Sequence, residues 1–184
     1  EDLDNIISLG FRGEALASIA SVSKIIIKSK TKDCEIGAEI SANGDEIGKI
    51  IDSPSIDGTE IIVDNLFFNT PVRAKFLKTA RSEEGEITSC VVGFILGNPN
   101  ISFKYTSNGK IVLQSYGDGL ESAMVKVYSP SVINDCFYID TEKNGIKITG
   151  YIGKHYFTKA NRSHQTVFIN GRRIINQTIS SAIG

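Results

Sequence analysis

Two stretches of the sequence combine residue types that could bind a nucleotide. The first is Gly10-Phe11-Arg12-Gly13-Glu14-Ala15-Leu16, a turn flanked by glycines that opens into an amphipathic segment. Glycine lets the backbone turn tightly and approach a ligand closely, and the N–H groups at a helix start attract anions. The turn is therefore a candidate phosphate-binding site, although a simple helix entry, with Glu14 placed to suit the dipole, also explains it. It is not a Walker A loop, because the sequence contains no G-x-x-x-x-G-K-[ST] pattern.

The second stretch runs from Gly58 to Leu77 and begins with Gly58-Thr59 ahead of a β-branched run. Asn69-Thr70-Pro71 follows, which predicts a helix start with a capping side chain and proline in the first turn. These residue types indicate a strand and a helix, but by themselves they name no reaction.

A third candidate is the arginine pair Arg172 and Arg173, which follows Asn170-Gly171. Such a pair is most simply a solvated turn. The formal net charge of -1 gives no electrostatic reason for the whole chain to bind nucleic acid. Any nucleic-acid contact must therefore depend on a local patch of this kind.

Short helices and short strands would position these residues. Periodicity predicts helices over 14–23, from 71 to 96 with a pause near 82–85, over 120–128 and over 175–183. Strands are expected over 24–29, 36–40, 49–51, 60–65, 101–106, 110–115, 136–140, 146–152 and 165–170, with Asn-Gly turns at 43–44, 108–109 and 144–145. The predicted fold class is α+β, because helices and strands do not alternate regularly. A domain boundary is expected near 116–119.

Composition excludes several classes of protein. The chain has 184 residues, 41% hydrophobic and 22% charged, and its apolar runs are shorter than a membrane-spanning helix requires. We expect no membrane association. Cys34, Cys90 and Cys136 are interpreted as reduced packing residues, since they are odd in number and widely spaced. His155 and His164 lack metal-ligand partners at a suitable spacing, so no metal site is expected.

Two sequence blocks together resemble a known family. G-F-R-G-E-A-L-A-S-I-A-S-V-S-K at 10–24 and G-T-E-I-I-V-D-N-L-F-F-N-T-P-V-R-A-K-F-L at 58–77 resemble the MutL family of DNA mismatch repair proteins. That family belongs to the GHKL ATPases, with gyrase, the Hsp90 chaperones and histidine kinases. The V-F-I-N-G-R-R-I segment at 167–174 is similar to the N-G-R segment of the family's second domain. The resemblance spans nearly the whole chain, with 29–57 and 116–160 matching only in outline.

The resemblance implies a fold and a set of site residues. Residues 1–116 would be the C-terminal part of a GHKL (Bergerat-type) ATPase α/β sandwich, and 117–184 part of a ribosomal protein S5 domain 2-like domain. The chain would then be an internal fragment of the family's N-terminal region. The backbone amides of Gly10, Phe11, Arg12, Gly13, Glu14, Ala15 and Leu16 would hold phosphate oxygens of ATP. Thr59 would lie in the adenine pocket, and Arg172, with Arg173 as a weaker companion, would contact DNA.

The catalytic parts of the family's site are not among these residues. Complete members have an upstream glutamate that activates water, and an asparagine that holds magnesium. Hydrolysis needs a positioned base and a metal ion. We therefore expect this chain alone to bind ATP and magnesium weakly at most and not to hydrolyse ATP.

For the whole protein, the resemblance implies an ATP-driven switch that couples mismatch recognition to strand removal. Expected partners are a mismatch-recognition protein of MutS type, a second copy in a homodimer, and DNA, bound weakly and without sequence specificity. The expected location is the bacterial cytoplasm, at the nucleoid during repair. Two alternatives remain: a GHKL ATPase with another task, such as a topoisomerase subunit, or an S5-like nucleic-acid-binding module without a nucleotide role.

Overall fold

The computed structural model describes residues 13–159, 161 and 164–183. The chain divides into two compact units, Glu1–Lys78 and Thr79–Gly184. This division falls before the long helix rather than near residue 116. The boundary at 116–117 therefore stays a prediction about the family's domains, while the compact units of this chain meet elsewhere.

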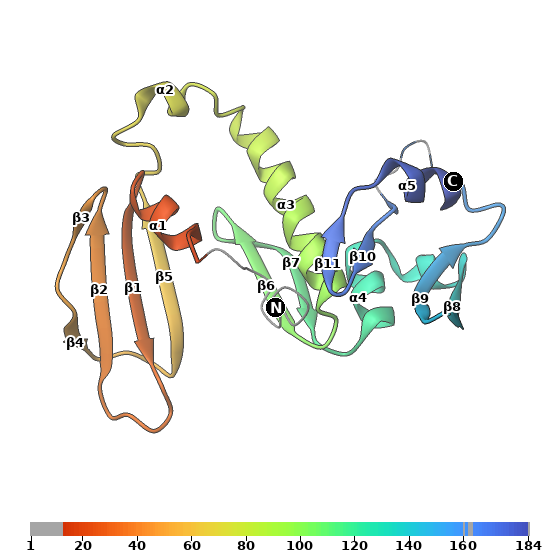
Figure 1. The fold of residues 1–184 in the computed structure, drawn as a ribbon, viewed down its shortest axis with the longest axis horizontal. Coiled ribbons are helices and arrows are strands. Elements are labelled where there is room, and N and C mark those ends of the chain that lie inside the picture. The colour runs from red at the N-terminus through yellow and green to blue at the C-terminus, as the bar shows by residue number, and fades with distance from the viewer. Residues whose placement is uncertain (1–12, 160, 162–163, 184) are drawn as a thin grey trace. The chain divides into compact units, whose positions relative to one another are not determined.

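The first unit is an antiparallel sheet with two short helices (Figure 1). Strands lie in the order β3-β2-β1-β5, and β4 pairs with β2. The elements are α1 (Ala15–Ala20), β1 (Lys24–Lys30), β2 (Gly37–Asn43), β3 (Glu46–Ile47), β4 (Ile51–Ser53), β5 (Gly58–Asp64) and α2 (Pro71–Ala74). The strands predicted at 24–29, 36–40 and 60–65 and the Asn43-Gly44 turn are confirmed. The strand predicted at 49–51 is replaced by the shorter strands β3 and β4, of which only β4 overlaps it, at Ile51.

Cross-strand register gives this sheet one apolar face and one face that mixes charged and apolar side chains. Ile25 pairs with Val63 and Ile27 with Ile61, so their side chains share a face. Ile25, only 3% exposed, is the buried residue of β1 on that face. The next residues along β1 alternate to the other face, where the Lys28 ammonium lies 3.6 Å from a Glu39 carboxylate oxygen. The alternation of side chains along paired strands thus separates the two faces.

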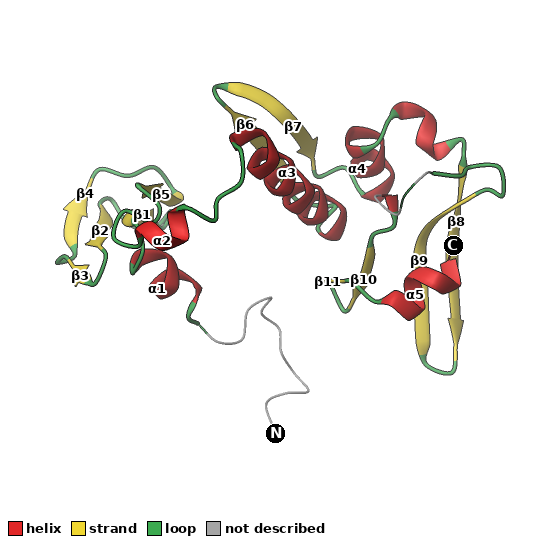
Figure 2. Cartoon of the chain, turned by 90° about the horizontal axis from the view of Figure 1, so that it is seen from above, coloured by secondary structure: helices red, strands yellow, loops and turns green. Residues whose placement is uncertain are grey.

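The second unit is a long helix with three hairpins and two short helices (Figure 2). The elements are α3 (Ala80–Gly97), β6 (Ser102–Ser107), β7 (Lys110–Tyr116), α4 (Leu120–Val127), a 3-10 turn (Pro130–Ile133), β8 (Cys136–Lys143), β9 (Ile146–Gly153), β10 (Val167–Ile169), β11 (Arg172–Ile174) and α5 (Gln177–Ile183). Each hairpin turns at an Asn-Gly pair, with φ near +50° at Asn108, Asn144 and Asn170. Strand β11 was not predicted.

The core of the second unit lies where α3 meets α4. Ile95 and Leu96 of α3 pack with Ala123 and Met124 of α4 and with Val132, and all five are buried. Cys136 packs against this cluster. The interpretation of all three cysteines as packing residues is wrong, because Cys34 and Cys90 are exposed.

Between Pro71 and Gly97 the helix boundaries differ from the prediction. The helix that starts at Pro71 ends after one turn, and Thr70 makes no capping side-chain hydrogen bond. Helix α3 then begins at Ala80, because the Thr79 hydroxyl caps it by accepting from the Ser82 N–H at 3.4 Å. It runs through 82–85 without the expected pause. Of the helices described, none combines the length and apolarity needed to cross a membrane.

Candidate nucleotide and nucleic-acid sites

The structure describes the predicted phosphate turn from Gly13 onward. Gly10, Phe11 and Arg12 lie outside the described residues. Gly13 has φ +65°, a left-handed conformation that favours glycine, and nothing lies within 4 Å of where its Cβ would be. The residues around it, from Gly13 to Leu16, are exposed.

Helix α1 offers backbone amides at its exposed start. The Ser18 N–H donates to the Glu14 carbonyl at 2.9 Å, so the amides of the first turn, Ala15 to Ala17, precede the first intrahelical donor. The predicted ten-residue helix has only six residues, and the Glu14 side chain makes no cap hydrogen bond. So short a helix supplies little dipole, and the open turn at Gly13 carries the argument for a phosphate site better than the dipole does.

The C-terminal end of α1 is fastened by the loop that follows β5. The Asn69 side-chain amide donates to the Ser21 carbonyl at 2.8 Å, and the Phe67 N–H donates to the Val22 carbonyl at 2.6 Å. Phe67 has φ +67° and Asn65 has φ +51°, an unusual conformation for an aromatic residue in particular. Asn69 thus holds α1 instead of capping α2, a role that its sequence position did not reveal.

Thr59, near the start of β5, lies at the opposite end of the sheet from α1. Its hydroxyl is 2.9 Å from the Ser29 hydroxyl on the neighbouring strand, and both residues are exposed. Helix α1 leads into β1 at Lys24, and Thr59 pairs with Ser29, which is about 17 Å farther along that strand. One nucleotide would have to extend along the sheet to contact both Thr59 and the phosphate turn.

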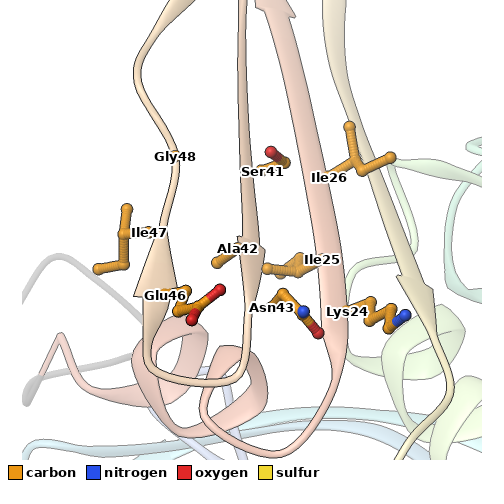
Figure 3. A pocket seen from close by; sticks show the side chains of 9 residues that line it. All are labelled: Lys24, Ile25, Ile26, Ser41, Ala42, Asn43, Glu46, Ile47 and Gly48. Atoms are coloured by element: carbon orange, nitrogen blue, oxygen red, sulfur yellow. The ribbon is translucent and has the colours of Figure 1, made fainter.

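An open hollow of about 520 Å³ lies over strands β1, β2 and β3 (Figure 3). Neighbouring strands supply its lining: Lys24, Ile25, Ile26, Ser41, Ala42, Asn43, Glu46, Ile47 and Gly48. No predicted site residue that the structure describes belongs to this lining. We assign it no ligand, since it is an open hollow on the surface of the sheet.

The two predicted DNA-binding arginines lie on β11 and point to opposite faces of the β10–β11 hairpin. Arg172 is half-buried and pairs with Ile169. Arg173 pairs with Phe168, and its Nη1 donates to the carbonyl of Ser89 in α3 at 3.0 Å. The structure therefore gives the two arginines different surroundings.

His164 lies next to this hairpin and was given no role from sequence. Its ring stacks on Tyr128, with ring centroids 4.7 Å apart. Desolvation, with the positive charge of Lys159 as a second cause, lowers the pKa of His164 below its ordinary value of 6.5. Among the described residues, no group of three or more His, Cys, Asp or Glu side chains could hold a metal ion.

Comparisons with known proteins identify the class of this fold. The ATPase domain of Aquifex aeolicus MutL complexed with ADP matches 98% of this chain with a TM-score of 0.78 and 28% identity, over 68% of that chain. The N-terminal domain of a DNA repair protein matches 96% with a TM-score of 0.77, at 20% identity, which supports the fold alone. The chain has the α+β fold of GHKL-type ATPase domains, as predicted.

Sequence comparison identifies the family within that class. A family model described as DNA mismatch repair protein, C-terminal domain, matches residues 124–184. DNA mismatch repair protein MutL of Clostridium botulinum (strain Eklund 17B / Type B) is 38% identical over all 184 residues, and that of Clostridium perfringens (strain 13 / Type A) is 38% identical over 183. The chain belongs to the MutL family of DNA mismatch repair proteins. It spans about a quarter (27%) of the length of those relatives.

Proposed function

We propose that this chain forms part of the nucleotide-driven switch of a MutL protein. ATP binds with its phosphates at Gly10–Leu16 and its adenine near Thr59, and binding and slow hydrolysis change the conformation and promote dimerisation. The observation that supports this most directly is the match, over 98% of the chain, to a MutL ATPase domain that holds ADP. A recognised switching mode orders a loop through γ-phosphate contacts.

The described residues fit the phosphate end of a nucleotide. The turn at Gly13 is open and exposed, and the first-turn amides of α1 precede the first intrahelical donor, Ser18. Magnesium bound with ATP usually takes its ligands from phosphate oxygens, water and one or two carboxylates, and its charge would offset that of the phosphates.

Thr59 fits the base end because its hydroxyl can both donate and accept a hydrogen bond. Ser29 lies 2.9 Å away and fixes the position of that hydroxyl on the edge of the sheet. A nucleobase edge offers donors and acceptors, so a positioned hydroxyl can read it directly or through a water molecule.

The test is ATP binding by the full-length protein and its Thr59→Val variant. Valine keeps the shape and β-branching of threonine but loses the hydroxyl, so the strand is expected to persist. Losing one neutral hydrogen bond, about 0.5–1.5 kcal/mol, weakens ATP binding by about two- to tenfold. Isothermal titration calorimetry measures this, with magnesium-dependent hydrolysis followed in parallel.

The matched control is Thr31→Val. Thr31 follows β1, and its hydroxyl donates to the Cys34 sulfur at 3.2 Å, outside the proposed site. ATP affinity is expected to stay unchanged in this variant. Equal ATP affinities in the wild type and the Thr59→Val variant would remove Thr59 from the adenine site, and absence of ATP binding by the wild-type protein would refute the switch.

For the second unit we propose weak, sequence-independent DNA binding through Arg172. An arginine next to an exposed Asn170-Gly171 turn can reach phosphate oxygens, and such contacts position DNA without reading its sequence. Arg172→Gln is expected to lower the slope of log affinity against log salt by about one, as for the loss of one phosphate contact. Binding of duplex DNA at several salt concentrations, measured by fluorescence anisotropy, checks this. An unchanged slope would rule out that contact.

The partners follow from the same switch. We propose that the ATP-bound protein pairs with a second copy and meets a mismatch-recognition protein of MutS type in the bacterial cytoplasm, at the nucleoid during repair. Sedimentation with and without a non-hydrolysable ATP analogue tests the dimer: the analogue is expected to raise the dimer fraction. An equal fraction in both conditions would contradict the proposal.

A further inference from the structure

The β10–β11 hairpin is attached to α3 by one of its two faces. Register places Phe168 of β10 opposite Arg173 of β11, so these two side chains lie on the same face. Arg172, one residue earlier, belongs to the other face together with Ile169. The face that carries Phe168 and Arg173 contacts α3, and the face that carries Ile169 and Arg172 is the opposite one.

Two glycines of α3 receive that face. A Cβ on Gly93 would lie 2.8 Å from Arg173 Nη1 and 3.0 Å from its Cδ, and a Cβ on Gly97 would lie 2.6 Å from Phe168 Cε1. The two glycines are four residues apart and therefore neighbours on one face of the helix. At either position a larger residue would make the facing side chain shift, so the present arrangement of Arg173 and Phe168 in a groove of α3 uses glycine at both positions.

The Arg173 guanidinium also has a defined acceptor in this groove. Its Nη1 donates to the Ser89 carbonyl, one turn of α3 before Gly93, at 3.0 Å. An ionised donor makes a stronger hydrogen bond than a neutral one, and the methylene stem packs along the glycine surface. The guanidinium is therefore held over the helix by both packing and hydrogen bonding.

We propose that Arg173 is a positioning residue that docks the β10–β11 hairpin on α3, while Arg172 makes the DNA phosphate contact. This inference rests on the proposed DNA binding by the same hairpin and divides the work between its two arginines. Arg173 acts by fixing the backbone of β11, the strand that also carries Arg172. Its charge contributes to the field around the hairpin but pairs with no phosphate.

Removing the Arg173 charge and filling the space at Gly93 are both expected to loosen the β10–β11 hairpin and to weaken DNA binding. Gly93→Ala leaves every charge in place but puts a Cβ where the Arg173 side chain lies, so that side chain must leave its place against α3 and the anchor is weakened. Arg173→Gln removes the anchor itself. Both variants are expected to weaken DNA binding by about two- to tenfold without changing its salt slope, because no phosphate contact is lost.

Gly85→Ala is the matched control for Gly93→Ala. Gly85 lies in the same helix, and nothing is within 4 Å of where its Cβ would be. This variant makes the same chemical change at an open position. It is expected to leave both the DNA affinity and the hairpin unchanged.

The experiment measures two properties of the full-length protein and its variants. Hydrogen exchange of the 167–174 amides reports docking, and the salt dependence of duplex DNA binding reports phosphate contacts. Arg173→Gln and Gly93→Ala are expected to speed hairpin exchange several-fold and keep the salt slope. Arg172→Gln is expected to keep the exchange rate and lower the slope by about one. Arg173→Lys, which keeps the charge but lacks the planar fork, is expected to speed exchange too and provides a milder second variant.

Two outcomes would overturn the proposal. One is a slope lowered by about one in Arg173→Gln with normal hairpin exchange, which would make Arg173 a DNA contact. The other is normal hairpin exchange in both Gly93→Ala and Arg173→Lys, which would show that this groove does not dock the hairpin. If the wild-type protein binds no DNA, the proposed DNA binding is refuted. The hairpin exchange rates would still show whether Arg173 docks the hairpin on α3.

Discussion

Replacing Asn69 by alanine tests how helix α1 is held in place. The Asn69 amide donates to the Ser21 carbonyl, at the C-terminal end of α1, across 48 residues of sequence. A six-residue helix is far too short to be stable alone in water. Its order must therefore come from contacts at its ends and with the sheet, and Asn69 supplies one of them.

The magnitude follows from the hydrogen bond that is lost. An ordinary neutral hydrogen bond contributes about 1 kcal/mol net, and Asn69 is exposed, so water replaces part of it. A loss of about 1 kcal/mol raises the local opening constant about fivefold. The second bond, from the Phe67 N–H to the Val22 carbonyl, remains, so α1 is expected to fray rather than to detach.

Hydrogen exchange with mass spectrometry measures this opening. The amides of Ser18 and Ser21, which donate within α1, are expected to exchange about fivefold faster in Asn69→Ala. The control is Asn98→Ala, which removes an equivalent amide bond, from the Asn98 side chain to the Phe94 carbonyl at 3.0 Å, in the second unit. Unchanged α1 exchange in Asn69→Ala, or equal acceleration in both variants, would refute the idea that Asn69 fastens α1.

Two further predictions concern the second unit. Gly97→Ala is expected to destabilise it by about 1–3 kcal/mol, since the new Cβ would lie 2.6 Å from Phe168 Cε1 and force the core apart. Urea unfolding followed by exchange of the α3 amides measures this, and a stability equal to wild type would contradict the close contact. Because desolvation and Lys159 lower the pKa of His164, the folded state binds a proton less readily than the unfolded state. Neutral His164 therefore makes its full contribution to stability above pH 6.5, the ordinary pKa of histidine. That contribution is lost as the pH falls through the lowered pKa of His164 in the folded state. Thermal unfolding at pH 7.5 and 5.5 should show a drop that is smaller in His164→Gln, and an equal drop in both proteins would count against the assignment.

The amino-acid sequence by itself determined most of the local structure. β-branched runs identified β1 and β5, and the Asn-Gly pairs placed the hairpin turns, because β-branched side chains favour strands and Asn-Gly favours a tight turn with positive φ. The two blocks at 10–24 and 58–77 also identified the family, which the comparisons confirm.

Helix boundaries were harder to predict because they depend on which carbonyls and hydroxyls find partners. The break between α2 and α3 is set by the Thr79 cap, and α1 stops at Ala20. The 71–97 periodicity could not reveal that break, since apolar spacing continues on either side of it. Strand β11 is only three residues long, which is too short for any alternation to be recognised.

Only the tertiary structure decided what individual polar side chains do. In the sequence, Asn69 looks like part of a helix start, and nothing distinguishes the role of Arg173 from that of its neighbour Arg172. In the fold, Asn69 bonds to Ser21 and Arg173 bonds to Ser89, each many residues away. Residue type fixes which hydrogen bonds a side chain can make, but the acceptor it meets depends on chain segments brought together by packing. The sequence therefore identified the family and its strands, whereas the folded chain assigned its polar side chains their partners.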